Sequence, residues 1–72
     1  MKMNKQKVKS SNIASIGYDE EKKILQVEFI RSGYYIYSNV SKETYSAFIN
    51  ASSKGKYFFK NIKGNYKFKK GE

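Results

Sequence analysis

Lysines alternate with aromatic residues along the last part of this 72-residue chain. Residues 54–72 carry seven lysines against one acid, Glu72. Lysine ammonium groups attract phosphates without reading base sequence, and the interleaved rings offer surfaces on which unpaired bases stack. Because seven like charges repel one another unless something neutralises them, we interpret the segment as a binding surface. The alternative is a solvated lysine face over an aromatic core. The candidate cations are Lys54, Lys56, Lys60, Lys63, Lys67, Lys69 and Lys70, with Arg31 added from the middle of the chain, and the candidate stacking residues are Tyr57, Phe59 and Tyr66.

Two further aromatic residues, Tyr35 and Tyr37, lie on one face of a predicted strand. With a two-residue turn at residues 32–33, both rings face outward and form a stacking platform. With a three-residue connection the register slips by one, and both rings turn into the core. We favour the core position, because buried alternating aromatics are the commoner case. The platform stays open as the alternative.

The chain offers little for catalysis or for metal binding. It contains no histidine and no cysteine, and it has no separated pair of carboxylates for acid–base work. The acids at residues 19–21 precede Lys22 and Lys23, which is typical of a solvated turn rather than a metal site. Ser53 before Lys54 could hold an anion at a helix start, although simple N-capping is the commoner role. We therefore expect a protein that is not an enzyme and needs no cofactor.

The composition describes one small, basic domain. Without cysteine the chain has no disulfide to stabilise it, and small domains then depend on their core or on a partner, so self-association is an open alternative. Twelve aromatic residues indicate an aromatic-rich core. No apolar run approaches the roughly 20 residues that cross a membrane. No apolar stretch follows the first lysines as in a signal peptide, so we expect a cytoplasmic protein.

The net charge of +9 is concentrated at the two ends of the chain. Residues 1–9 carry +4, residues 10–53 carry −1 and residues 54–72 carry +6. Such asymmetry indicates an anionic partner. Residues 1–9 lack any periodic apolar pattern, so we predict a flexible basic leader there and a single domain over residues 10–70.

Periodicity predicts an α+β fold. Alternating residues at 13–18, 24–31 and 34–38, joined by short turns, predict a three-stranded antiparallel meander. The pattern then becomes helical. Ser41 is a good N-cap for a helix reaching about residue 51, and Ser53 for a second short helix ending near residues 63–64. An extended C-terminal segment follows, where Tyr66 and Phe68 alternate with Lys67 and Lys69, and this is either a last strand or a tail.

Several short motifs occur in order along residues 10–68. They are Ser10–Ile13, Gly17–Asp19, Leu25–Phe29, the Tyr-x-Tyr at Tyr35–Tyr37, and Ser53–Phe58 followed by Asn61 and Ile62. Together they resemble the KTSC domain, named for its place at the C-terminus of some lysyl-tRNA synthetases and here standing alone. The resemblance implies an RNA-binding role. Two positions depart from the family pattern: Ser41 stands where proline is common, and Phe59 where a polar residue is frequent.

Two functions follow as hypotheses. The first is a nucleic-acid-binding module, with RNA favoured, that uses the C-terminal lysines and aromatics. Since lysine predominates over arginine, base-specific bidentate contacts are not expected. The second is a small oligomeric protein that captures a nucleotide-like anion or blocks a partner protein, as small proteins of phages and other mobile elements often do.

Overall fold

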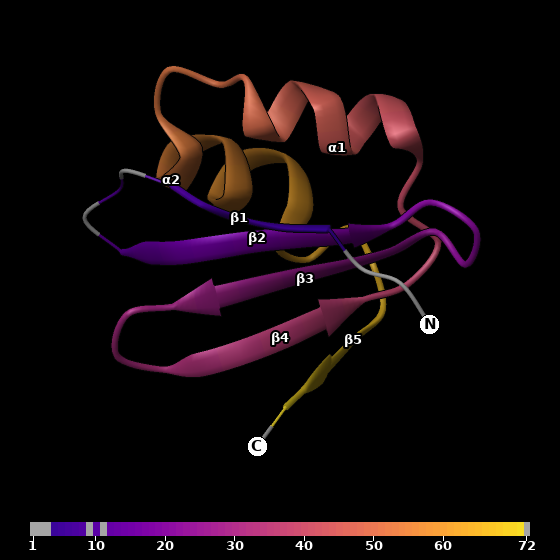
Figure 1. Cartoon of the computed structure of the whole chain (residues 1–72), viewed down its shortest axis with the longest axis horizontal. Coiled ribbons are helices and arrows are strands. Elements are labelled where there is room, and N and C mark those ends of the chain that lie inside the picture. Colours follow the sequence, from indigo (N-terminus) through magenta and orange to yellow (C-terminus); the bar gives the residue numbers. More distant parts are fainter. Residues whose placement is uncertain (1–3, 9, 11, 72) are drawn as a thin grey trace.

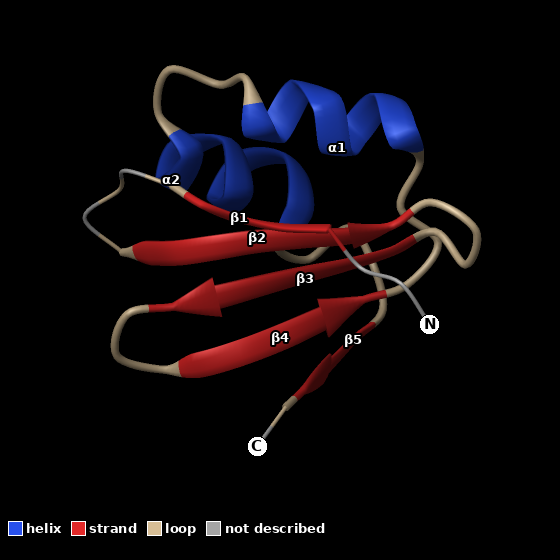
Figure 2. Cartoon of the chain, in the orientation of Figure 1, coloured by secondary structure: helices blue, strands red, loops and turns tan. Residues whose placement is uncertain are grey.

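A five-stranded antiparallel sheet carries two helical segments on one face (Figures 1 and 2). This computed structural model describes residues 4–8, 10 and 12–71. The strands are β1 (Asn4–Lys7), β2 (Ile13–Asp19), β3 (Ile24–Phe29), β4 (Gly33–Tyr37) and β5 (Phe68–Lys70), and the helices are α1 (Lys42–Ile49), α2 (Lys54–Tyr57) and the π-helix η1 (Phe58–Ile62). The predicted α+β class is confirmed. Within the described residues, no helix is long and apolar enough to cross a membrane.

The sheet contains two strands more than the sequence predicted. Its order is β1-β2-β3-β4-β5, so the predicted meander forms the centre and one strand is added at each edge. Residues 4–7 of the predicted flexible leader pair with residues 15–18 as β1. The C-terminal segment pairs with β4 as β5. Residues 1–3 and 9 of that leader lie outside the described residues.

The connection between β3 and β4 decides which way the central tyrosines point. Phe29 pairs with Gly33, which leaves three residues in the connection, and Gly33 adopts a positive φ of 79°. In this register Tyr35 lies opposite Val27, which is fully buried. Tyr37 is itself only 3% exposed. Both rings therefore face the helices, and an outward stacking platform on the open sheet face is excluded.

The two predicted helix caps are present. The Ser41 side chain accepts a hydrogen bond from the Thr44 amide (3.2 Å), and the Ser53 side chain accepts one from the Lys56 amide (3.4 Å). Helix α2 then widens into η1, whose last turn closes with the Lys63 amide donating to the Phe58 carbonyl at 2.8 Å. This second helical segment ends at Ile62 with Lys63 as its C-cap, within two residues of the predicted end near residues 63–64.

The core lies between the helices and the sheet. Phe48, Phe58 and Ile62 from the helical segments are buried on the sheet residues, which include Ile16, Leu25 and Val27. The Tyr18 hydroxyl donates to the buried Val40 carbonyl at 2.6 Å, and its ring stacks on Tyr45 at 4.6 Å. The buried apolar side chains of the sheet and of the helical segments thus form a single core.

We predict that this core loses stability in alkali. Burial, together with the neighbouring Tyr35, raises the pKa of Tyr37 to about 12, and burial also raises the pKa of Tyr18. In an unfolded chain both tyrosines ionise near pH 10. Their full contribution to the free energy of unfolding is therefore present below that pH and is lost as the pH rises toward 12. For Tyr37 the expected loss of unfolding free energy is about 1.4 kcal/mol per pH unit between pH 10 and 12.

Urea denaturation at a series of alkaline pH values, with tyrosinate absorbance recorded in parallel, measures this loss. The Tyr37→Phe variant should show a shallower decline than the unmodified protein. A free energy of unfolding that stays constant between pH 10 and 12 would contradict the prediction.

Candidate nucleic-acid interface

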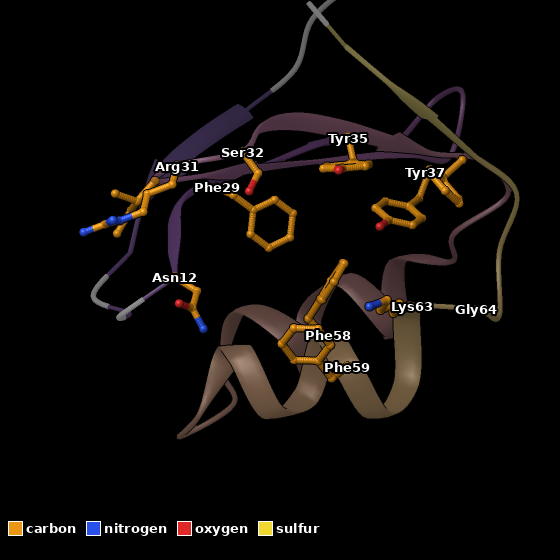
Figure 3. Close-up of a pocket in the computed structure, with 12 residues that line it drawn as sticks. Asn12, Phe29, Arg31, Ser32, Tyr35, Tyr37, Phe58, Phe59, Lys63 and Gly64 are labelled. Atoms are coloured by element: carbon orange, nitrogen blue, oxygen red, sulfur yellow. The ribbon is translucent and has the colours of Figure 1, made fainter.

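A pocket of about 530 Å³ opens between the sheet and the helical segment opposite (Figure 3). Its volume lies within the range of roughly 300–1,000 Å³ typical of small-ligand sites. Figure 3 shows rings from the sheet on one side and rings from η1 on the other. Six aromatic residues line it: Phe29, Tyr35, Tyr37, Phe58, Phe59 and Phe68. We call this the aromatic pocket.

Contacts between rings hold the walls of the aromatic pocket in place. The Phe58 ring meets Phe29 edge-to-face at 5.2 Å and Tyr37 at 5.6 Å. Tyr35 makes a similar contact with Phe29 at 5.6 Å. These geometries are the favourable ones for aromatic pairs. These contacting rings form the inner wall of the aromatic pocket. They come from β3, β4 and η1 and pack against the core.

The mouth of the pocket, in contrast, is apolar and exposed. Ile30, Phe59 and Phe68 are the exposed large hydrophobic residues of the described chain, with 55%, 55% and 58% of their surface accessible. All three line the aromatic pocket. Single exposed apolar residues are ordinary, but a group gathered at one concavity marks an interaction site. The pocket therefore has the surface of a binding site.

The charged residues of the aromatic pocket are all cations. Arg31 and Lys63 line it, and no acid does. The Lys63 ammonium lies 5.0 Å from the centre of the Phe59 ring, and the Lys70 ammonium lies 5.9 Å from that of Tyr35, both within cation–π range. Across the described residues the single ion pair joins Lys42 and Glu20 on the surface, so neither Arg31 nor Lys63 forms an ion pair with a described acid. The site therefore favours an anion.

Two further hollows share lining residues with the pocket and hold three more predicted lysines. We call Lys54, Lys56 and Lys60 the lysine shelf. Phe59 lines the aromatic pocket and both hollows, so its exposed ring joins the pocket to the shelf. Lys54 is held in place by a hydrogen bond from its ammonium to the Ala51 carbonyl at 3.2 Å.

The remaining predicted residues lie elsewhere. Lys69 pairs with Ile36, which alternates with the inward tyrosines, so Lys69 lies on the open sheet face. Tyr66 is half-buried with its hydroxyl 3.4 Å from Thr44 Oγ1, and Lys67 is exposed just before β5. The Tyr57 ring stacks on the core residue Phe48 at 5.7 Å while lining one of the hollows. The structure thus divides the predicted surface. Tyr66, Lys67 and Lys69 lie away from the aromatic pocket, whereas the pocket and its two adjoining hollows hold Arg31, Lys54, Lys56, Phe59, Lys60 and Lys63.

Sequence reasoning missed several residues of the pocket. Phe29 and Phe58 had been placed only on the apolar faces of a strand and a helix, and Asn12 and Ile30 carried no signal for a site, whereas Phe68 is one of the aromatic residues that alternate with the C-terminal lysines. The three-residue connection after Phe29 was the one usable sign, because it turns the central tyrosines toward the helices and places Ile30 and Arg31 at the mouth.

Comparison with known proteins gives a consistent family. The KTSC domain model matches residues 9–66. An uncharacterized protein of Stutzerimonas stutzeri is 39% identical over 56 residues, which cover 78% of this chain and 79% of that protein. The crystal structure of a KTSC domain protein from Yersinia pestis superposes with a TM-score of 0.96 at 38% identity, covering 99% of this chain and 100% of that one. The chain belongs to the KTSC domain family.

Proposed function

We propose that the protein is a non-enzymatic cytoplasmic module that binds single-stranded nucleic acid, RNA in preference to DNA. One observation carries the proposal: an exposed aromatic residue, Phe59, joins a ring-lined pocket to a lysine shelf, and every charged residue of that surface is a cation. Stacking platforms beside positive grooves are the common solution for single strands. The arrangement needs no base-specific contact, so low sequence specificity is expected.

The pocket supports binding rather than catalysis. Its lining contains no histidine, cysteine, aspartate or glutamate that could act as base or nucleophile. Tyr37, with its pKa raised to about 12 by burial and by Tyr35, stays protonated at neutral pH. The groups that remain are rings, an amide, a hydroxyl and two cations, which hold a ligand without reacting with it.

Salt dependence tests the proposal. If three to five cations contact phosphates, log affinity for single-stranded RNA should fall with log salt at a slope of roughly −2 to −4. Fluorescence anisotropy with a labelled single-stranded RNA, titrated at several salt concentrations, measures the slope. Single- and double-stranded RNA and DNA of equal length should be compared, and single-stranded RNA should bind most tightly.

The triple variant Lys56→Gln, Lys60→Gln, Lys63→Gln should lose most of that slope. Lys22→Gln is the matched control, because Lys22 is an exposed lysine in the β2–β3 turn and lines none of these hollows. An absence of binding to every strand at low salt would refute the proposal.

The volume of the aromatic pocket, about 530 Å³, favours one second candidate, the capture of a free nucleotide-like anion by a small oligomer. That function predicts affinity that does not grow with strand length, together with a discrete oligomer in native mass spectrometry. Strand length therefore separates the two candidates.

A further inference from the structure

We infer that the aromatic pocket takes one unstacked nucleotide from within a strand, with its base among the rings and a phosphate held at each end. The inference rests on the proposed function and specifies which part of the nucleic acid enters the protein. It is carried by the shape of the pocket, by the placement of its two cations and by its continuity with the lysine shelf.

The pocket is bounded by two layers of structure. The Phe29, Tyr35 and Tyr37 rings of β3 and β4 lie on one side of it and the Phe58 and Phe59 rings of η1 on the other (Figure 3). The Phe58 ring touches those of Phe29 and Tyr37 edge-to-face. A base paired in a duplex offers only its edge to such a space, whereas an unpaired base can leave its stack and enter with a face against aromatic side chains. The chemistry therefore selects a single nucleobase, and its size fits a volume of about 530 Å³.

The two lining cations lie at different ends of the pocket. Figure 3 shows Arg31 on the turn after Phe29 at one end, and Lys63 beside Gly64 near Tyr37 at the other. Both side chains are exposed. A nucleotide inside a strand carries a phosphate on its 5′ side and another on its 3′ side, so two separated cations match an internal nucleotide better than a terminal one.

The strand has a continuous path beyond the pocket. Asn12 lines both the aromatic pocket and the hollow that holds Lys54 and Lys56. Phe59 borders the same junction. A strand leaving the pocket past Asn12 therefore meets the lysine shelf with its next phosphates. The π-helical turn contributes here, because successive residues Phe58 and Phe59 both line the pocket, one as wall and one as rim.

Calorimetric titration with small ligands tests the two-phosphate match. At low salt, adenosine 3′,5′-bisphosphate should bind at least tenfold more tightly than either adenosine monophosphate, and adenosine should bind most weakly. Arg31→Gln and Lys63→Gln should each reduce that preference severalfold, while Lys22→Gln should leave it unchanged. A bisphosphate that binds no better than a monophosphate overturns the two-ended site.

A second comparison tests base insertion in the strand itself. A five-nucleotide RNA should bind at least tenfold more tightly than the same RNA with an abasic central position. Equal affinity of the two strands overturns insertion but leaves RNA binding by the lysines intact. If neither strand binds at low salt, the proposed function itself fails, and bisphosphate binding without strand binding also overturns the inference.

Discussion

The Phe58→Ala variant should lose about 3–5 kcal/mol of folding free energy, the range measured for removal of a buried aromatic ring. Phe58 is 3% exposed and its ring contacts rings from both layers of the fold: Phe29, Tyr37, Phe48 and Phe59. A domain of this size has only about 4–11 kcal/mol in total. The midpoint of thermal unfolding, followed by circular dichroism, should fall by more than about 12 °C.

Two neighbouring variants serve as controls for this prediction. Phe58→Leu keeps most of the volume and should be destabilised less than Phe58→Ala. Phe59→Ala removes a ring of the same size from the adjacent, exposed position and should change stability by no more than about 0.5 kcal/mol. If Phe58→Ala unfolds at the same temperature as Phe59→Ala, the ring does not join the layers as described.

The centre of the fold was predictable because its signals are local. Alternating apolar residues from Ile24 to Phe29 fix β3, and its short turns to β2 and β4 fix antiparallel pairing. Ser41 and Ser53 stand where a side-chain oxygen can satisfy the first free amides of a helix, and the structure uses both. These elements depend on neighbours in sequence.

The first edge strand was not predictable, and the last was indicated only as a strand or a tail, because the residues of neither one specify a pairing partner. Asn4–Lys7 contains no apolar residue, so β1 has no periodicity, and it forms through backbone pairing with β2. Strand β5 has three residues and depends on β4, about 30 positions earlier. Lysines on edge strands are typical, since charge there discourages pairing with other chains. The missing apolar periodicity that indicated a flexible leader is thus compatible with a charged edge strand as well.

The candidate site was predictable in its chemistry but not in its shape. Lysines next to aromatic residues indicated an anion-binding surface, and the structure gathers Lys54, Lys56, Lys60 and Lys63 around Phe59. That a pocket remains beside the contacting Phe29 and Phe58 rings depends on the register across the β3–β4 connection and on the packing of η1 against the sheet. Neither this register nor this packing is encoded in a pattern of neighbouring residues.

The largest expected effect on binding falls on Phe59. Its ring is exposed and borders the aromatic pocket and both adjoining hollows. The Lys63 ammonium lies 5.0 Å from the centre of this ring. Stacking of one base on an aromatic side chain contributes about 1–3 kcal/mol, so Phe59→Ala should weaken binding of single-stranded RNA roughly 10- to 100-fold. Fluorescence anisotropy at constant salt measures the change. Since the lysines remain, the dependence of log affinity on log salt should keep its slope.

Matched variants separate stacking from general loss of apolar surface. Phe59→Trp keeps a stacking ring and should retain affinity, whereas Phe59→Leu keeps apolar area without a π-face and should bind nearly as weakly as Phe59→Ala. Tyr34→Ala removes a ring from the opposite sheet face and should have little effect on binding, since Tyr34 alternates with the inward Tyr35. Full affinity in Phe59→Leu would show that the ring acts only as apolar cover, and a slope lost together with affinity would assign the effect to displaced lysines instead.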